Sequence, residues 1–231
     1  MPEEGSQTLA VRRRTPLSAF AHALLAEYGP QGWWPLLAHA GSNPTLTGRL
    51  TGYHPSDFTF PRTDAQRFEI CCGAILTQNT AWTNVERALA ALAGRALLSP
   101  HAILAAQNST LELAIRSSGY FRAKAKKLRG FSAFYLALGG RTPSREQLLA
   151  VWGVGPETAD SILLYAYQQT EMVVDTYTIR VLVKHGYCRL PLDYARAKRY
   201  CEARLPRSLE AYQEFHALMV EHAKRLRTAG T

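Results

Sequence analysis

Residues 148–160 read LLAVWGVGPETAD, and the apolar segment SILLYAY follows at residues 161–167. This pattern predicts a helix, a tight hairpin and a second helix. Gly153 and Gly155 permit the positive φ angles and the close backbone approach that a side chain would block, and Pro156 is typical of the first position of a helix. Exposed amides at a helix start suit a phosphate, so we interpret the hairpin as a clamp on a DNA backbone. The alternative is a plain helical hairpin whose glycines serve geometry alone.

Helix signals recur along the rest of the chain, and no segment shows a convincing strand pattern. The helical period of residues 121–138 ends at two glycines, and residues 36–61 have the Gly, Pro and Ser content of an irregular insertion. The sequence therefore predicts an all-α protein. Further helices are expected to start at Thr15 before Pro16, Thr63 with Gln66, Ser99 before Pro100, Ser109 with Glu112, and Ser144 with Gln147.

The composition indicates a folded chain. It has 231 residues, of which 47% belong to the hydrophobic set and 19% are charged, and this balance is too apolar for a disordered tail. No apolar run approaches the ~18 residues that a membrane span needs, so we expect no membrane insertion. The first residues lack an apolar core followed by a small-residue cleavage site. We therefore expect a cytoplasmic location, at the nucleoid if the source is prokaryotic.

An excess of basic residues points to a polyanionic partner. Lys and Arg total 27 against 18 Asp and Glu, a net charge of +9, and nucleic acid most often accounts for such an excess. Residues 116–129 hold six basic residues, among them Lys124, and no acid. We interpret this segment as a phosphate-binding face. A solvated helix face whose lysine stems lie over apolar surface is the alternative.

The four cysteines do not have the spacing of a metal site. Cys71 and Cys72 are adjacent within an apolar stretch, and Cys188 and Cys201 stand far from them and from each other. We expect the adjacent pair to be small core residues and predict no metal ligand in the chain.

Asp175 is the candidate catalytic residue. It lies in MVVDTYTIR, residues 172–180, directly before an amphipathic stretch, where a carboxylate also serves as an N-cap. The helix dipole keeps the carboxylate ionised, and an anion beside a sugar stabilises an oxocarbenium-like transition state and orients a water molecule. The capping and catalytic roles are compatible.

Three ordered motifs resemble those of the endonuclease III type of base-excision DNA glycosylases. They are Gly153-Val154-Gly155-Pro156, Val173-Val174-Asp175, and GAILTQNT at residues 73–80; GYFRAKA at residues 119–125 resembles the second DNA-contact loop of the family. The resemblance covers about residues 15–227. It implies a bilobal helix-hairpin-helix fold with the active site in the cleft between two helical lobes, residues 70–168 forming a central barrel and residues 15–69 plus 169–231 the second lobe.

The resemblance also implies roles for individual residues. Gln78 and Tyr120 match positions that fill the gap left by a flipped-out nucleotide, although Gln78 as a helix-terminus hydrogen-bond partner and Tyr120 as a core residue are the alternatives. Trp33 and Trp34 resemble the motif of members that act on alkylated purines, where they would stack on a cationic base; packing in the core or at a lobe junction is equally compatible. Lys224 resembles a lysine near the pocket of that branch. DNA-backbone contacts are assigned to Lys124, Gly153, Val154 and Gly155.

Two departures from the family pattern bear on the chemistry. Bifunctional relatives carry a lysine nucleophile where this chain has Glu157, so we expect no Schiff base from that position. Glu157 is kept as a base-pocket candidate, with a helix-dipole role as the alternative. Many relatives bind an iron-sulfur cluster through C-terminal cysteines, but residues 216–231 contain none, so no cluster is expected.

The sequence thus predicts a monofunctional glycosylase that acts on double-stranded DNA containing damaged bases, with an alkylated purine such as 3-methyladenine as substrate. A glycosylase for oxidised or mismatched bases is one alternative. A non-catalytic helix-hairpin-helix DNA-binding module is the other, although such a module would be expected to lack the acid at position 175.

Overall fold

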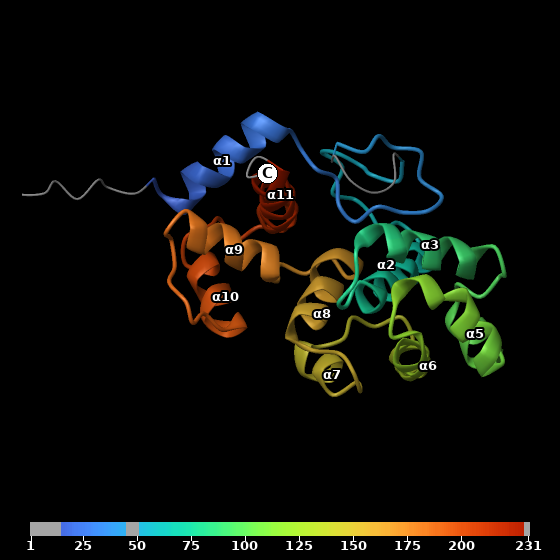
Figure 1. Ribbon diagram of the computed structural model, residues 1–231. Helices are drawn as coiled ribbons and strands as arrows, with labels where there is room; N and C mark the ends of the chain where they lie inside the picture. Colours follow the sequence, from blue (N-terminus) through green and yellow to red (C-terminus); the bar gives the residue numbers. More distant parts are fainter. Residues whose placement is uncertain (1–14, 45–50, 229–231) are drawn as a thin grey trace, which may run out of the picture.

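A computed structural model describes residues 15–44 and 51–228 and confirms the all-α prediction (Figure 1). Within these residues there is no strand, only an isolated bridge between Ser42 and Thr51. The helices are α1 (Leu17–Tyr28), α2 (Asp64–Leu76), α3 (Trp82–Ala93), α4 (Pro100–Ala105), α5 (Asn108–Ala114), η1 (Arg116–Ser118), α6 (Phe121–Leu138), α7 (Arg145–Leu149), α8 (Pro156–Ser161), the π-helical turn η2 (Ile162–Ala166), α9 (Thr176–Lys184), α10 (Tyr194–Glu202) and α11 (Leu209–Thr228).

Helix α2 lies at the centre of the fold. Every residue from Phe68 to Leu76 is buried, and a helix that is buried all round must be covered on every side. The covering elements are α3, α6, α8 and η2. Cys71 and Cys72 are fully buried in this helix, which confirms their prediction as core residues.

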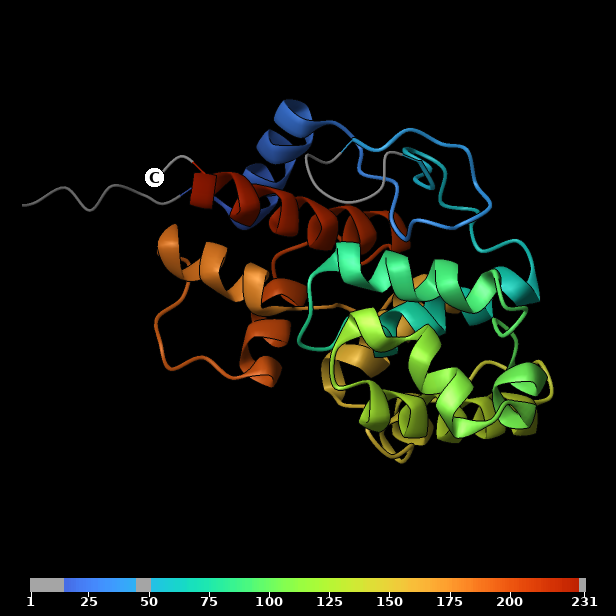
Figure 2. The same cartoon turned by 45° about the vertical axis from the view of Figure 1, so that its right-hand side comes forward.

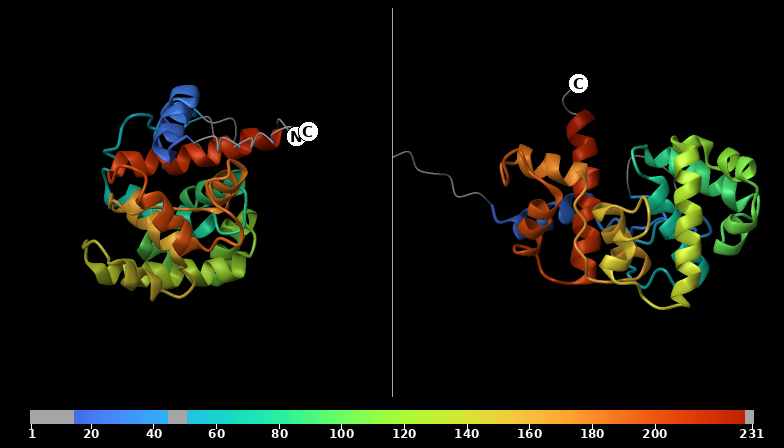
Figure 3. Two further views of the ribbon diagram at one scale, coloured as in Figure 1. Left: turned by 90° about the vertical axis from the view of Figure 1, so that its left-hand side faces the viewer. Right: turned by 90° about the horizontal axis from the view of Figure 1, so that it is seen from below.

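The two ends of the described chain pack together. α1 and α9 both pack on α11, and α11 also contacts η2. Figure 1 shows α1, α9, α10 and α11 beside one another and α2 to α6 on the other side, and Figures 2 and 3 show the same separation from other directions. The predicted boundary at residue 70 falls inside α2, which begins at Asp64. The division into lobes with those bounds stays a prediction.

A buried ionic cluster joins the hairpin to α10. The carboxylate of Asp160 is fully buried and accepts hydrogen bonds from Arg145 Nε at 2.6 Å, Tyr194 Oη at 2.7 Å and Lys198 Nζ at 2.8 Å. Lys198 also pairs with Glu171. A buried carboxylate with three donor side chains is well satisfied, whereas removing one partner would leave uncompensated charge in the core. The cluster therefore holds α8 in a defined place relative to α7 and α10.

Most predicted helix starts are confirmed. Capping boxes form at Thr63 and Ser144, and the side chain of Ser99 caps α4. Two predictions were wrong by a residue or two. α1 is capped by Pro16 rather than Thr15, and α5 begins at Asn108 with Gln107 as its N-cap and no side-chain cap, so the pair Ser109 and Glu112 does not start it.

The described parts of the insertion, residues 36–44 and 51–61, are irregular as predicted. They still contribute to the core, because Tyr53 and Phe60 are buried. His54 is buried as well and bonds through Nε2 to the carbonyl oxygen of Trp34 at 3.0 Å. The insertion therefore supports the tryptophan pair. Among the described residues, no helix has the length and apolarity to cross a membrane.

Candidate active site

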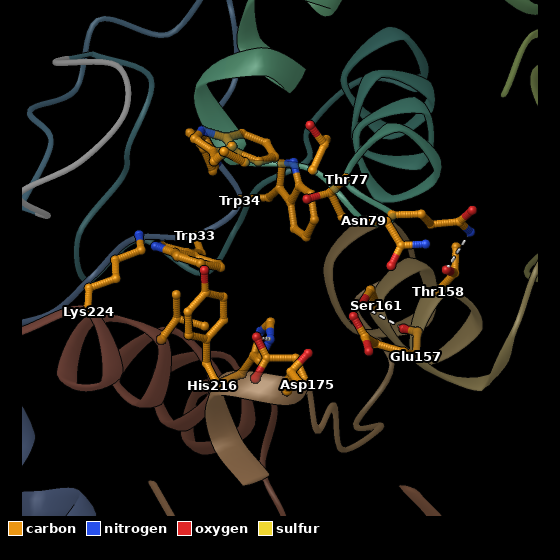
Figure 4. Close-up of a pocket in the computed structure, with 18 of the residues that line it drawn as sticks. Trp33, Trp34, Thr77, Asn79, Glu157, Thr158, Ser161, Asp175, His216 and Lys224 are labelled. Atoms are coloured by element: carbon orange, nitrogen blue, oxygen red, sulfur yellow. Dashed lines mark hydrogen bonds and ion pairs between the residues drawn. The ribbon is translucent and has the colours of Figure 1, made fainter. Parts of the chain in front are cut away.

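A cavity of about 510 Å³ opens where the hairpin, α9, α11 and the segment after α2 meet (Figure 4). It brings together residues that are far apart in the sequence. Its walls include Trp33, Trp34, Thr77, Gln78, Asn79, Trp82, Gly155, Glu157, Asp175, Arg180, His216 and Lys224.

Asp175 lies in this cavity as the N-cap of α9. Its Oδ1 accepts hydrogen bonds from the backbone N of Thr178 at 2.7 Å and from the hydroxyl of Thr178 at 2.8 Å, and its Oδ2 lies 3.8 Å from His216 Nε2. Burial acts to raise the pKa of Asp175, but the bonds and charge of His216 and Thr178 outweigh it and hold that pKa below its usual value. The carboxylate is therefore an anion that lines the cavity, with Oδ1 bonded to Thr178 and Oδ2 near His216.

Glu157 lines the same cavity from the first turn of α8. Its side chain is solvent-exposed, but partial desolvation in the cavity raises the pKa of its carboxyl group, and the negative charge of Asp175 raises it further. The pKa values of the two carboxyl groups of the site are thus shifted in opposite directions.

The two adjacent tryptophans have different environments. Trp34 is 5% exposed and makes edge contacts with Trp82 and Tyr165, each at a centroid distance of 5.3 Å. Its indole packs on α2 at Gly73, where a Cβ would lie only 2.9 Å from the indole nitrogen. Trp33 is half-buried and lies edge-on to His216 at 5.6 Å. Trp34 is therefore mainly a packing residue of the core, which is the alternative to base stacking. Trp33 borders the space available to a ligand.

Lys224 reaches the cavity from α11. Burial lowers the pKa of its amine, against the charges of Glu221 and Asp175. It stands two helical turns beyond His216, or about 12 Å along the axis. Figure 4 shows its side chain beside Trp33 and away from Asp175.

The hairpin has the geometry that its glycines predict. Gly153 has a φ of +84°, and a Cβ there would lie 2.6 Å from the side chain of Lys127. Gly155 is extended and would have open space around a Cβ, and the side chain of Val154 is buried. Only the backbone of this turn is thus available to a phosphate, and open space remains in front of Gly155.

Gln78 does not project as a free wedge. Its amide nitrogen donates to the carbonyl oxygen of Gly153 at 3.1 Å and to the hydroxyl of Thr158 at 2.9 Å, and its oxygen accepts from Lys127. The structure therefore favours the alternative, a hydrogen-bond partner that supports the hairpin. The neighbouring Asn79 is exposed at the cavity with a φ of +53°, and the sequence interpretation missed it.

The assignment of Lys124 as a DNA contact was wrong. Lys124 is 2% exposed, and its amine donates to the carbonyl oxygens of Leu76 at 2.9 Å and Ser118 at 2.6 Å. Burial lowers its pKa to about 8. It is a structural residue, because those two carbonyls lie at the end of α2 and in the turn before α6 and need donors.

The rest of the basic segment divides into outward and inward side chains. Arg116, Arg122 and Lys126 are exposed, and Lys126 lies over the ring of Trp152, which is 55% exposed at the hairpin. Tyr120 is 74% exposed in the left-handed conformation before α6. The core alternative for Tyr120 is thereby removed.

The cysteines present do not fit an iron-sulfur cluster. Cys71 and Cys72 lie in α2 and Cys201 in α10, and burial raises the pKa of all three thiols. Within residues 15–44 and 51–228, no three His, Cys, Asp or Glu side chains are grouped to hold a metal ion. These positions do not have the grouping that the four-thiolate ligand set of such a cluster requires, and the absence of a cluster stays a prediction.

A model of the HhH-GPD superfamily of base excision DNA repair proteins matches residues 72–207. The chain belongs to this superfamily. It is 37% identical over 213 residues to a protein of Methanocaldococcus jannaschii named as a presumed DNA repair glycosylase, which covers 87% of this chain and 84% of the relative.

Two solved structures resemble the fold. One is the 3-methyladenine DNA glycosylase of H. pylori bound to 1,N6-ethenoadenine, with a TM-score of 0.62, 29% identity and coverage of 69% of this chain and 85% of the other. The second is an endonuclease III trapped as a covalent intermediate with DNA, with a TM-score of 0.60, 25% identity and coverage of 67% and 72%. The protein is therefore a DNA glycosylase of base excision repair, and DNA is its partner.

Proposed function

We propose that this protein is a monofunctional DNA glycosylase that removes an alkylated purine, such as 3-methyladenine, by hydrolysis. The observation that carries the proposal is the pair of carboxyl groups in the cavity, Asp175 and Glu157. Glu157 occupies the position at which bifunctional relatives hold their lysine nucleophile, and a carboxylate cannot form an imine.

The proposed chemistry starts with a nucleotide that is flipped out of the duplex into the cavity, because the glycosidic bond is unreachable within the stack. As the bond between C1′ and the base nitrogen breaks, positive charge develops on the sugar, and the anion of Asp175 stabilises it. Water adds to C1′ and loses a proton to the surrounding carboxylate or solvent. A purine alkylated at a ring nitrogen such as N3, as in 3-methyladenine, already carries positive charge in the nucleotide, so its departure needs no strong general acid.

Trp33 supports the choice of substrate class. Its half-buried ring borders the cavity beside His216, and an aromatic face attracts a cationic base more strongly than a neutral one. The fold likeness to a 3-methyladenine glycosylase points the same way. A glycosylase for oxidised or mismatched bases would use the same Asp175 and would be distinguished by its lesion range. The substrate implies a location with the DNA, in the cytoplasm or at the nucleoid.

The substrate proposal is tested with a panel of duplexes that contain 3-methyladenine, 1,N6-ethenoadenine, 8-oxoguanine, a thymine mismatch or no lesion. We expect release of alkylated purines and intact strands that break only after alkali. Release confined to the oxidised or mismatched duplexes would refute the substrate class. No release from any duplex would leave the non-catalytic alternative.

The monofunctional proposal is tested by borohydride trapping. Lys224 is the amine whose side chain lines the cavity in the described chain, so Lys224→Met serves as the matched variant. We expect no trapped adduct from either protein. An adduct that forms with the wild type and disappears in Lys224→Met would show that the enzyme is bifunctional.

A further inference from the structure

His216 occupies a position that the sequence interpretation did not single out. It lies on α11, is 5% exposed, and presents Nε2 to Asp175 Oδ2 at 3.8 Å. Its other ring nitrogen, Nδ1, lies 2.8 Å from the hydroxyl of Tyr165 in η2. One buried imidazole thus connects the π-helical turn after the hairpin to the candidate catalytic carboxylate.

The hydrogen bonds of Tyr165 bear on which ring nitrogen of His216 carries the proton. The hydroxyl has two acceptors in reach, His216 Nδ1 at 2.8 Å and the carbonyl oxygen of Gln213 at 3.3 Å. Gln213 is in α11, so its carbonyl is also an acceptor of the helical ladder. We infer that Tyr165 donates over the shorter of the two distances, to Nδ1; donation to Gln213 instead would place the proton on Nδ1. Donation to Nδ1 leaves the proton of the neutral ring on Nε2, which faces Asp175.

Aromatic contacts hold this arrangement in place. Trp33 lies edge-on to His216 at 5.6 Å, and Trp34 lies edge-on to Tyr165 at 5.3 Å. The rings of His216 and Tyr165 are both buried, and the surrounding aromatic side chains restrict their rotation. The adjacent tryptophans therefore hold His216 and Tyr165 in place and also border the cavity.

We propose that His216 is a positioning residue for Asp175, with Tyr165 fixing its tautomer so that Nε2–H is directed at the oxygen of Asp175 that Thr178 leaves free. The inference rests on the proposed role of Asp175. Thr178 bonds to Oδ1, and His216 Nε2 lies at an ion-pair distance of 3.8 Å from Oδ2, so both carboxylate oxygens have a partner before DNA binds. A fixed anion costs no reorganisation when charge develops on the sugar.

Charged groups on α8 and α11 act on the pair, and Arg180 of α9 lines the same cavity. Glu157 of α8 faces Asp175 and repels its charge, Lys224 of α11 attracts it, and Glu214 acts on Tyr165. His216 Nε2 lies at an ion-pair distance of 3.8 Å from Asp175 Oδ2. Removal of His216 should therefore affect the ionisation of Asp175 directly.

The test compares His216→Leu with His216→Gln in single-turnover excision from an alkylated duplex. Leu has no donor, whereas the amide of Gln can still donate toward Asp175. We expect His216→Leu to slow excision about tenfold to hundredfold, the loss expected for a hydrogen bond to a charged group, with unchanged DNA affinity. His216→Gln should recover much of the rate.

The dependence of the excision rate on pH distinguishes a positioning role of His216 from a merely structural one. His216 lowers the pKa of Asp175, so its removal raises that pKa, and the acid limb of the rate profile shifts to higher pH. An unmoved limb, or one shifted to lower pH, would overturn the inference. If His216→Leu does not fold, Tyr165→Phe decides, because it removes only the hydroxyl and should shift the limb in the same direction by a smaller amount.

A double-mutant cycle separates this inference from the function on which it rests. If His216 acts through Asp175, His216→Leu should have no further effect on the residual rate of Asp175→Asn. An equal slowing in both backgrounds would contradict the inference while leaving Asp175 catalytic. Full activity of Asp175→Asn alone would refute the proposed function instead.

Discussion

Replacing Asp175 by Asn separates its charge from its capping role. The Asn oxygen can still accept from the backbone N and hydroxyl of Thr178, which now bond to Oδ1 at 2.7 and 2.8 Å, and Asn is as good an N-cap as Asp. What is lost is the negative charge toward the cavity. We therefore expect a folded protein that binds lesion-containing DNA and barely excises the base.

The size of the effect follows from the electrostatics. An anion about 4 Å from a developing unit positive charge contributes about 4 kcal/mol at an effective dielectric constant of about 20. At about 1.4 kcal/mol for each factor of ten, the rate of base release should fall about a thousandfold. The wild-type carboxylate has a lowered pKa, so its charge also stabilises the fold above the ordinary pKa of Asp, and this contribution is lost as the pH falls through the folded-state value.

The assay is single-turnover release of an alkylated purine from a duplex, with DNA affinity measured in parallel. Asp193→Asn is a matched control, because Asp193 caps α10 through a bond from the backbone N of Arg196 at 2.8 Å and is exposed outside the cavity. The control should keep its rate. Near-normal turnover by Asp175→Asn, or an equal loss in the control, would refute the catalytic assignment.

Three further predictions concern DNA binding, stability and metal content. Lys126→Met should lower the slope of log affinity against log salt by about one. Lys124→Met should leave that slope unchanged and destabilise the fold by about 1–3 kcal/mol for each carbonyl left unsatisfied. Equal salt slopes for the two variants would contradict the structural role of Lys124. Gly155→Leu should weaken DNA binding with little loss of thermal stability, since the backbone is extended and the space around it open; undiminished binding in a gel-shift assay would remove the phosphate clamp. The purified protein should be colourless, and stoichiometric iron by elemental analysis would refute the prediction that it binds no cluster.

Local sequence patterns were sufficient to predict the hairpin, several helix starts and Asp175. The hairpin depends on Gly153, whose φ is +84°, and glycine is the residue that adopts such an angle without strain. The helix starts at Thr63, Ser99 and Ser144 depend on side chains that bond to amides a few residues away. Asp175 as the N-cap of α9 belongs to the same class. Interactions of this kind form between residues a few positions apart. The sequence alone therefore determined the all-α fold, the hairpin and the candidate catalytic carboxylate.

The tertiary structure decided which side chains face inward and which residues meet. Lys124 and Lys126 are two positions apart in one helix, yet the first is buried against the end of α2 and the second is exposed; composition and charge are the same for both, and only the packing of α6 on α2 separates them. Gln78 bonds to the hairpin for a similar reason. His216 reaches Asp175 because α11 packs on both α9 and η2. No local pattern encodes that approach, since it depends on the burial of apolar surface between helices that are distant in the chain.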